Sequence, residues 1–439
     1  MRTLLLTALA AFLLLAPYPA AAQTDPVQID ENVAQSVFGV DVRELRFRLS
    51  ARAQPQDRIR SVLLLYYVDD SPVQNSAIPN YQPGTSVSAV YLWRVAGLLA
   101  PGSEIKYQWQ VETDSGRKHT TPVQTVSYAD ARFPWREMKG EQVTLYWHDV
   151  DQLAAQNLLD EARKAQTRLR SDYGLTLERP VRVYVYGRAQ DYSGAVSTAG
   201  RRPELAMTFG QDRIFVLAQP GQEGTASALQ GIRQEIATAI FVQKTDNPYG
   251  PPPQWLAEGF SLFLGGSAVS DNNQKALQQF AQNNRLLPLR TLNGNFPSTD
   301  NERALAYAES LSVVKFIFDS YGPDKVRATL AAYKDGNTVD DGLKKGLGVT
   351  LDQLEGRWKN ALKSGAAAKP APKGGAANPD DPVARIFGVR ALEFWQGIFG
   401  PNARWVLIGG AGFVGLAVVG VVVGSAVAAI RKAHQETEG

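Results

Sequence analysis

The chain contains no cysteine among its 439 residues. This absence excludes disulfide bonds, catalysis by a thiol and anchoring through a lipidated N-terminal cysteine. Histidine is almost as scarce, because only His119, His148 and His434 are present. The formal net charge is just +3, and no block of lysine and arginine stands out. Nucleic-acid binding therefore has little support.

Long apolar runs are confined to the two ends of the chain. Arg2, the run from Leu4 to Leu15 and the small residues Ala20–Ala22 are typical of a secretory signal, so residues 1–22 are predicted to be a signal peptide. Pro17 and Pro19 argue against the alternative, an uncleaved anchor.

The second apolar run predicts a membrane span. Residues 405–430 carry no charged side chain and are long enough to cross a hydrocarbon core of about 30 Å. Arg431 and Lys432 follow at once, so residues 431–439 are expected to lie in the cytoplasm. The ends together predict a single-pass protein of the cell membrane with its bulk outside the cytoplasm. The absence of disulfides favours a bacterial envelope.

Two features near the span leave alternatives open. Residues 384–400 are rich in apolar side chains and form either an interfacial helix on the outer membrane surface or a prelude continuous with the span. Gly420, Gly424 and Ala428 form a stripe of small residues that would allow a homodimer, although glycine is also common in spans that do not associate.

The N-terminal part of the mature chain has the pattern of a β-sandwich. Apolar and polar residues alternate from Ile105 to Val111, as in a strand with one buried face. Residues 62–68 and 87–95 also predict strands, and turn residues separate the segments. We therefore expect residues 27–135 to form a sandwich of the immunoglobulin or fibronectin type. The Cys–Trp–Cys hallmark is absent, so the expectation concerns architecture alone.

Residues 140–363 predict a second domain in which strands lead into a helical half, which gives the α+β class overall. Strands are expected at 142–148 and 181–186, with a hairpin at 207–218. Residues 364–383 are rich in Ala, Pro, Lys and Gly and predict a flexible linker. The helices are expected at 150–173, 225–243, 253–264, 274–284, 302–321, 324–333, 339–347 and 351–363.

The segment at the start of the helix expected at 253–264 is similar to a known family. Pro253–Phe260, with the sequence PQWLAEGF, resembles the P-x-W-L-x-E-G segment of peptidase MA-like proteins, a gluzincin branch of the zinc peptidases. The resemblance implies that Glu258 stands where the family has its third zinc ligand. It also aligns Gln234–Thr238 with the family's His-Glu-x-x-His motif and Glu235 with its general base. Tyr307 then corresponds to a residue that steadies a tetrahedral intermediate, unless it is simply packed between helices.

The departures from the family pattern affect the metal. Gln234 and Thr238 replace both histidines, and no histidine lies between His148 and His434. A zinc hydrolase needs three protein ligands and an open position for water. Amide and hydroxyl oxygens are weak neutral donors, better suited to Ca²⁺. We therefore expect no metal and no other cofactor.

Three hypotheses for the function follow. The first is a catalytically degenerate metallopeptidase relative that binds a peptide or protein partner or acts as a scaffold, with an extended peptide added to the edge of the 207–218 hairpin. The second is an active metallo-hydrolase that uses Glu235 and Glu258 with atypically held zinc. In the third, the β-sandwich makes all the contacts, and Glu258 merely pairs with Arg233 or Arg213. Paired carboxylates also serve glycoside hydrolysis, but nothing else in the sequence suggests sugar chemistry.

Overall fold

The computed structural model describes residues 25–365, apart from positions 26, 40–41, 96–98, 197–205 and 270. The signal peptide, the segment 384–400, the span, the tail and nearly all of the linker lie outside the described residues. Within them, no helix is both long and apolar enough to cross a membrane. The described residues form several sheets and eight α-helices, so the α+β class is confirmed.

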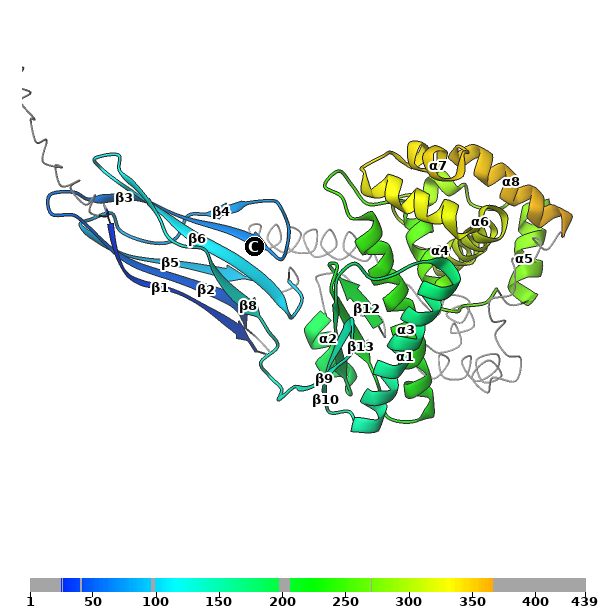
Figure 1. Cartoon of the computed structure of the whole chain (residues 1–439), viewed down its shortest axis with the longest axis horizontal. Coiled ribbons are helices and arrows are strands. Elements are labelled where there is room, and N and C mark those ends of the chain that lie inside the picture. Colours follow the sequence, from blue (N-terminus) through cyan, green and yellow to red (C-terminus); the bar gives the residue numbers. More distant parts are fainter. Residues whose placement is uncertain are drawn as a thin grey trace, which may run out of the picture. The chain divides into compact units, whose positions relative to one another are not determined.

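The chain divides into two compact units (Figure 1). Of the described residues, the first contains those up to 36, 45–93 and 104–127, and the second contains those of 37–44, 94–103 and 128–365. Each unit is described by itself below.

The first unit consists of two sheets whose apolar faces pack together. One sheet has the order β1-β2-β5, and the other has the order β4-β3-β6-β7, with β8 paired to β6. Phe47 of one sheet meets Tyr107 of the other edge to face, with ring centroids 5.0 Å apart. The strands expected at 62–68, 87–95 and 105–111 are all present. The strands are β1 (Val27–Phe38), β2 (Arg43–Ala53), β3 (Ile59–Val68), β4 (Asn75–Ala77), β5 (Ser86–Arg94), β6 (Ser103–Thr113), β7 (Lys118–Thr120) and β8 (Gln124–Tyr128).

A mixed five-stranded sheet forms the first half of the second unit, in the order β12-β13-β11-β10-β9. The three central strands are parallel, and the two outer strands run antiparallel to their neighbours. In the central strand β11, Val181, Val183 and Val185 are buried in the core that α1 and α3 cover, and Tyr184 and Tyr186 pack on the opposite face. The strands are β9 (Arg136–Lys139), β10 (Val143–His148), β11 (Val181–Tyr186), β12 (Ala206–Phe209) and β13 (Arg213–Leu217).

Helices account for the rest of the second unit. Helix α1 begins where the Asp151 side chain accepts a hydrogen bond from the Ala154 N–H and ends at Gly174, which adopts the left-handed conformation (φ 63°). Helices α1 and α3 pack against each other beside the sheet (Figure 1). The helices are α1 (Gln152–Tyr173), α2 (Ala189–Val196), α3 (Gln222–Thr245), α4 (Gln254–Leu264), α5 (Asp271–Gln282), α6 (Asp300–Lys334), α7 (Val339–Leu347) and α8 (Leu351–Ser364), with a 3₁₀ turn η1 (Leu289–Leu292).

Three differences from the expected elements have physical reasons. Helices expected at 302–321 and 324–333 are the two arms of α6, which kinks where Gly322 leaves the helical region (φ 78°, ψ 167°) before Pro323. Helix α2 and strand β9 were not expected, because eight and four residues are too few for a clear period.

Helices α4 and α6 approach each other unusually closely, and this contact fixes the position of Glu258. A Cβ atom on Gly259 would lie 2.2 Å from the Ser310 carbonyl oxygen of α6. Only glycine allows this approach. The residue next to Glu258 is therefore held against a buried part of α6.

Candidate functional site

Two carboxylates from neighbouring helices form the centre of the candidate site. Glu235 lies in the middle of α3 and Glu258 lies near the start of α4, and both are half-buried. Burial raises the pKa of Glu235 to about 7. Burial, followed by the nearby charge of Glu235, raises the pKa of Glu258 to about 8. The two residues that the family resemblance singled out therefore lie close enough for one charge to act on the other.

Glu235 is tied to the outer strand of the sheet. The Thr208 hydroxyl of β12 donates a hydrogen bond to the Glu235 Oε2 atom at 2.6 Å. This bond favours the ionised form and opposes the effect of burial on the pKa of Glu235. Thr208 was not among the expected site residues, since nothing in the sequence pairs a strand residue with a helix residue 27 positions away.

Gln234 bonds to the turn that follows α4. Its Nε2 atom donates to the Ser267 Oγ atom at 3.0 Å, and only 4% of the residue is exposed. A Cβ atom on Gly265 would lie 2.3 Å from the Gln234 Cγ atom, so the glycine makes room for this side chain. The amide is therefore packed into the structure.

Thr238 makes a second link between α3 and α4. Its hydroxyl lies 2.8 Å from the Ser261 hydroxyl of α4 and donates to the Gln234 carbonyl oxygen at 3.0 Å. Ser261 Oγ also donates to the Gln234 carbonyl oxygen at 3.3 Å. The two positions that hold histidine in the family thus cross-link two helices here. Neither serine stood out in the sequence.

These contacts bear on whether Gln234, Thr238 and Glu258 could bind a zinc ion. Within the described part of the chain, no group of three or more His, Cys, Asp or Glu side chains is arranged to hold a metal ion. The amide of Gln234 and the hydroxyl of Thr238 are neutral donors already engaged by Ser267 and Ser261. Zinc in proteins takes thiolate, imidazole and carboxylate ligands. The residues present do not fit a zinc ion.

Tyr307 and the arginines near the site have structural partners. Tyr307 is 2% exposed and packs edge to face on Phe296, with centroids 4.9 Å apart. Arg233 donates to Glu161 at 2.8 Å, and Arg213 donates to Ser103 at 2.8 Å. Arg233 and Arg213 therefore bond to Glu161 and Ser103, in place of the suggested pairing with Glu258. Burial, not an arginine, dominates the charge state of Glu258.

Glu309 is a further buried carboxyl group that the sequence did not single out. It lies on α6, is 0% exposed and accepts a hydrogen bond from the Leu287 N–H at 3.0 Å. Its Oε2 atom is buried without a hydrogen-bond partner. Burial raises the pKa of Glu309 to about 8.

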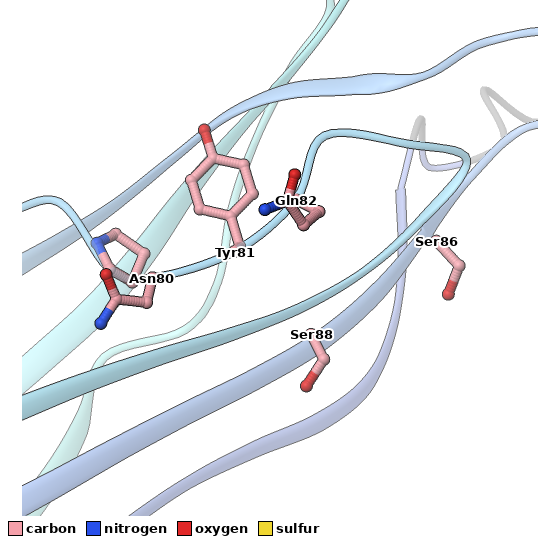
Figure 2. Close-up of a pocket in the computed structure, with 6 residues that line it drawn as sticks. Asn80, Tyr81, Gln82, Ser86 and Ser88 are labelled. Atoms are coloured by element: carbon pink, nitrogen blue, oxygen red, sulfur yellow. The ribbon is translucent and has the colours of Figure 1, made fainter.

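The first unit has a surface depression of its own. It has a volume of about 590 Å³ and is open to solvent. Figure 2 shows Asn80, Tyr81 and Gln82 on the loop before β5, with Ser86 and Ser88 on the strand itself. The Tyr81 hydroxyl is already used, because it donates to the Arg60 carbonyl oxygen at 3.0 Å. The depression contains no charged side chain suited to catalysis.

A family model matches the part of the chain that contains the carboxylate pair. Residues 161–364 match the Peptidase MA superfamily. This part of the chain is a gluzincin-type, peptidase-like domain. No curated protein matches the sequence.

Solved structures give looser likenesses. Aminopeptidase A from Legionella pneumophila, crystallised with aspartic acid, is 10% identical with a TM-score of 0.32, and the match covers 78% of this chain and 50% of that enzyme. An aminopeptidase N family protein from Idiomarina loihiensis is 11% identical with a TM-score of 0.27, covering 73% of this chain and 68% of that one. The chain spans half the length of the Legionella enzyme. At these TM-scores the likenesses do not assign the activity of either protein to this chain.

Proposed function

We propose that the peptidase-like domain binds a peptide or protein partner at the cell envelope and does not hydrolyse it. The observation that carries this proposal is the pair of links from Gln234 to Ser267 and from Thr238 to Ser261. Side chains at the family's two histidine positions hold α3 against α4. A water molecule next to Glu235 then has no metal to lower its pKa.

The edge of the sheet supports binding of an extended chain. Among the described strands, β12 pairs with β13 alone, so its other side can accept hydrogen bonds from an added strand. Thr208 of β12 also contacts Glu235. A peptide bound along β12 would therefore lie beside the carboxylate pair. The proposal places this surface outside the cytoplasm, tethered to the membrane by residues 405–430.

One observation favours a second candidate, an active hydrolase with atypical metal ligands. The pKa of Glu235 is raised to about 7, which is the range that suits a general acid or base at neutral pH. Perturbed pKa values also gather at functional sites. This candidate requires both Glu235 and Glu258 to act, with zinc held between Glu258 and neutral oxygen atoms.

The two candidates are separated by an assay of the purified full-length chain against a mixture of unstructured peptides, with and without added zinc. We expect no cleavage above the level of a Glu235→Gln variant. The matched control is Glu223→Gln, which changes an exposed glutamate in the first turn of the same helix. Cleavage that disappears in Glu235→Gln but persists in Glu223→Gln would contradict the proposed binding role.

A further inference from the structure

His148 occupies an unusual position at the carboxyl end of β10. Its ring stacks on Phe133, with centroids 3.9 Å apart and ring planes at 8°. Trp135 meets the same ring edge to face at 6.2 Å. The Nε2 atom is buried and has no hydrogen-bond partner. A buried imidazole nitrogen without a partner carries a free-energy cost that a suitable neighbour could remove.

The nearest acid to that nitrogen belongs to the first turn of α2. The Asp191 Oδ2 atom lies 3.8 Å from His148 Nε2, and about a fifth of each side chain is exposed. This distance is too long for a hydrogen bond but short enough for an ion pair when the imidazole is protonated. Asp191 therefore stabilises neutral His148 very little. When His148 is protonated, the Asp191 carboxylate lies beside its Nε2–H group and stabilises the positive charge.

Other charges near the ring are mostly paired among themselves. Asp130 accepts two hydrogen bonds from the Arg132 guanidinium, at 2.8 and 2.6 Å. Arg132 also lies over the Phe133 ring, 4.7 Å from its centroid, and would oppose a second cation there. Among the described residues, the titratable and charged groups near His148 and α2 are Asp130 and Arg132 from the segment before β9, Arg43 from β2, Tyr184 and Tyr186 from β11, Asp191 from α2, and the ion pair of Asp149 with Arg188 from the strand-to-helix turns.

We propose that the contact between His148 and Asp191 is a pH-sensitive tie, which holds α2 to the end of β10 more firmly in mildly acidic solution. Histidine is the side chain whose charge ordinarily changes between about pH 5 and 8. Protonation turns the 3.8 Å contact into an ion pair and adds a cation–π attraction to Phe133.

The tie acts on a short helix that Arg132 also anchors. The Arg132 Nη2 atom donates to the Asp191 carbonyl oxygen at 3.1 Å, and a Cβ atom on Gly194 would lie 2.9 Å from Arg132 Nη1. These contacts persist at any pH at which Arg132 is charged. The pH-dependent part of the anchoring of α2 therefore comes from His148. The inference does not depend on what the carboxylate pair binds.

Hydrogen exchange of the full-length chain tests the tie. The protection of α2 amides, corrected for the intrinsic rate at each pH, should rise about two- to fivefold from pH 7.5 to pH 5.5, as expected of a partly exposed ion pair. Two variants should reduce the rise to the part that the buried glutamates contribute to the whole fold: Asp191→Asn, and His148→Phe, which keeps a ring on Phe133 but cannot ionise. His119→Asn is the matched control, because His119 pairs with Asp25 instead.

Each outcome either supports or overturns the tie between His148 and Asp191. A rise in the wild type and in His119→Asn that is larger than the rise in His148→Phe and in Asp191→Asn supports the tie. A wild-type protection that does not change with pH overturns it, and so does a rise in His148→Phe as large as that in the wild type. If Asp191→Asn does not fold, the comparison of wild type with His148→Phe gives the same decision.

Discussion

Gln234 and Thr238 each bond through their polar groups to residues of α4 or of the turn after it. A histidine at either position would not make the same bonds, because its ring nitrogens lie at other distances from the backbone than the Gln234 amide or the Thr238 hydroxyl. The bond of Gln234 to Ser267 also requires Gly265, whose missing Cβ leaves space for the amide side chain. The hydrogen bonds of positions 234 and 238 thus depend on the residues around them in α4 and in the turn after it.

Buried carboxyl groups give the protein an unusual dependence of stability on pH. Glu309 has a pKa of about 8 in the folded chain, above the ordinary value of 4.5. Between these values the folded state binds more protons than the unfolded state, so the free energy of unfolding falls as pH rises. Glu235 and Glu258 act in the same direction.

Glu309→Gln should remove the contribution of this group. Relative to the variant, the wild type should lose on the order of 2–4 kcal/mol of unfolding free energy between about pH 5 and 8.5. Urea denaturation at several pH values measures the difference. Glu223→Gln, at an exposed position, serves as the control and should follow the wild type. Parallel pH profiles for the wild type and Glu309→Gln would show that Glu309 is not held neutral by the fold.

Sequence patterns singled out the two carboxylates as candidates but not the residues that bond to Glu235, Gln234 and Thr238 of α3. Glu235 and Glu258 stood out because a family segment aligned with them. Thr208, Ser261 and Ser267 did not stand out, since small polar residues are common and their partners lie far away in sequence. A hydrogen bond between elements depends on how those elements pack, and the sequence shows that only indirectly.

At the scale of elements, the contact of α4 with α6 sets the geometry of the site. Gly259 lies against the Ser310 carbonyl oxygen, so this contact has no space for even one methyl group. Overpacking of this kind costs free energy because backbone must move.

A pair of glycine substitutions tests this contact. Gly259→Ala should lower the free energy of unfolding by about 1–3 kcal/mol. Gly356→Ala is the matched control on α8, because no atom lies within 4 Å of its added Cβ. This substitution, at an exposed helical position, should instead raise the free energy of unfolding by about 0.5–1 kcal/mol. Thermal or urea denaturation compares the two, and an equal response of both variants would contradict the close packing of α4 on α6.

Elements with a clear signal in the sequence were predictable. The strands β10 and β11 lie within a few residues of their expected positions because each has a clear period, and the helices α1, α7 and α8 do so because each also has a capping residue. The kink of α6 was expected as a break, since Gly322 and Pro323 adjoin. Strand β9 has no such signal. Its place at the sheet edge depends on pairing with β10.

At the scale of the whole molecule, each of the two compact units has buried residues of its own. Phe47 is fully buried in the first unit, and Trp358 is 1% exposed in the second. The tether at residues 405–430 and a homodimer through Gly420, Gly424 and Ala428 stay predictions, because both concern residues outside those described.

Separate cores predict separate responses to core mutations. Phe47→Ala should cost about 3–5 kcal/mol of local stability and raise hydrogen exchange in the first unit. Exchange in α3 and α4 should remain unchanged. Trp358→Ala should give the reverse pattern. A uniform loss of protection across both units after either substitution would show that they unfold as one cooperative body.

The measurement that tests the central claim most directly is a zinc titration by calorimetry. It compares the full-length wild type with a variant that carries Gln234→His and Thr238→His. We expect no zinc binding by the wild type and tight binding of one zinc ion by the variant, because two imidazoles and Glu258 then supply three ligands. Stoichiometric zinc uptake by the wild type would contradict the loss of the zinc site and favour the hydrolase.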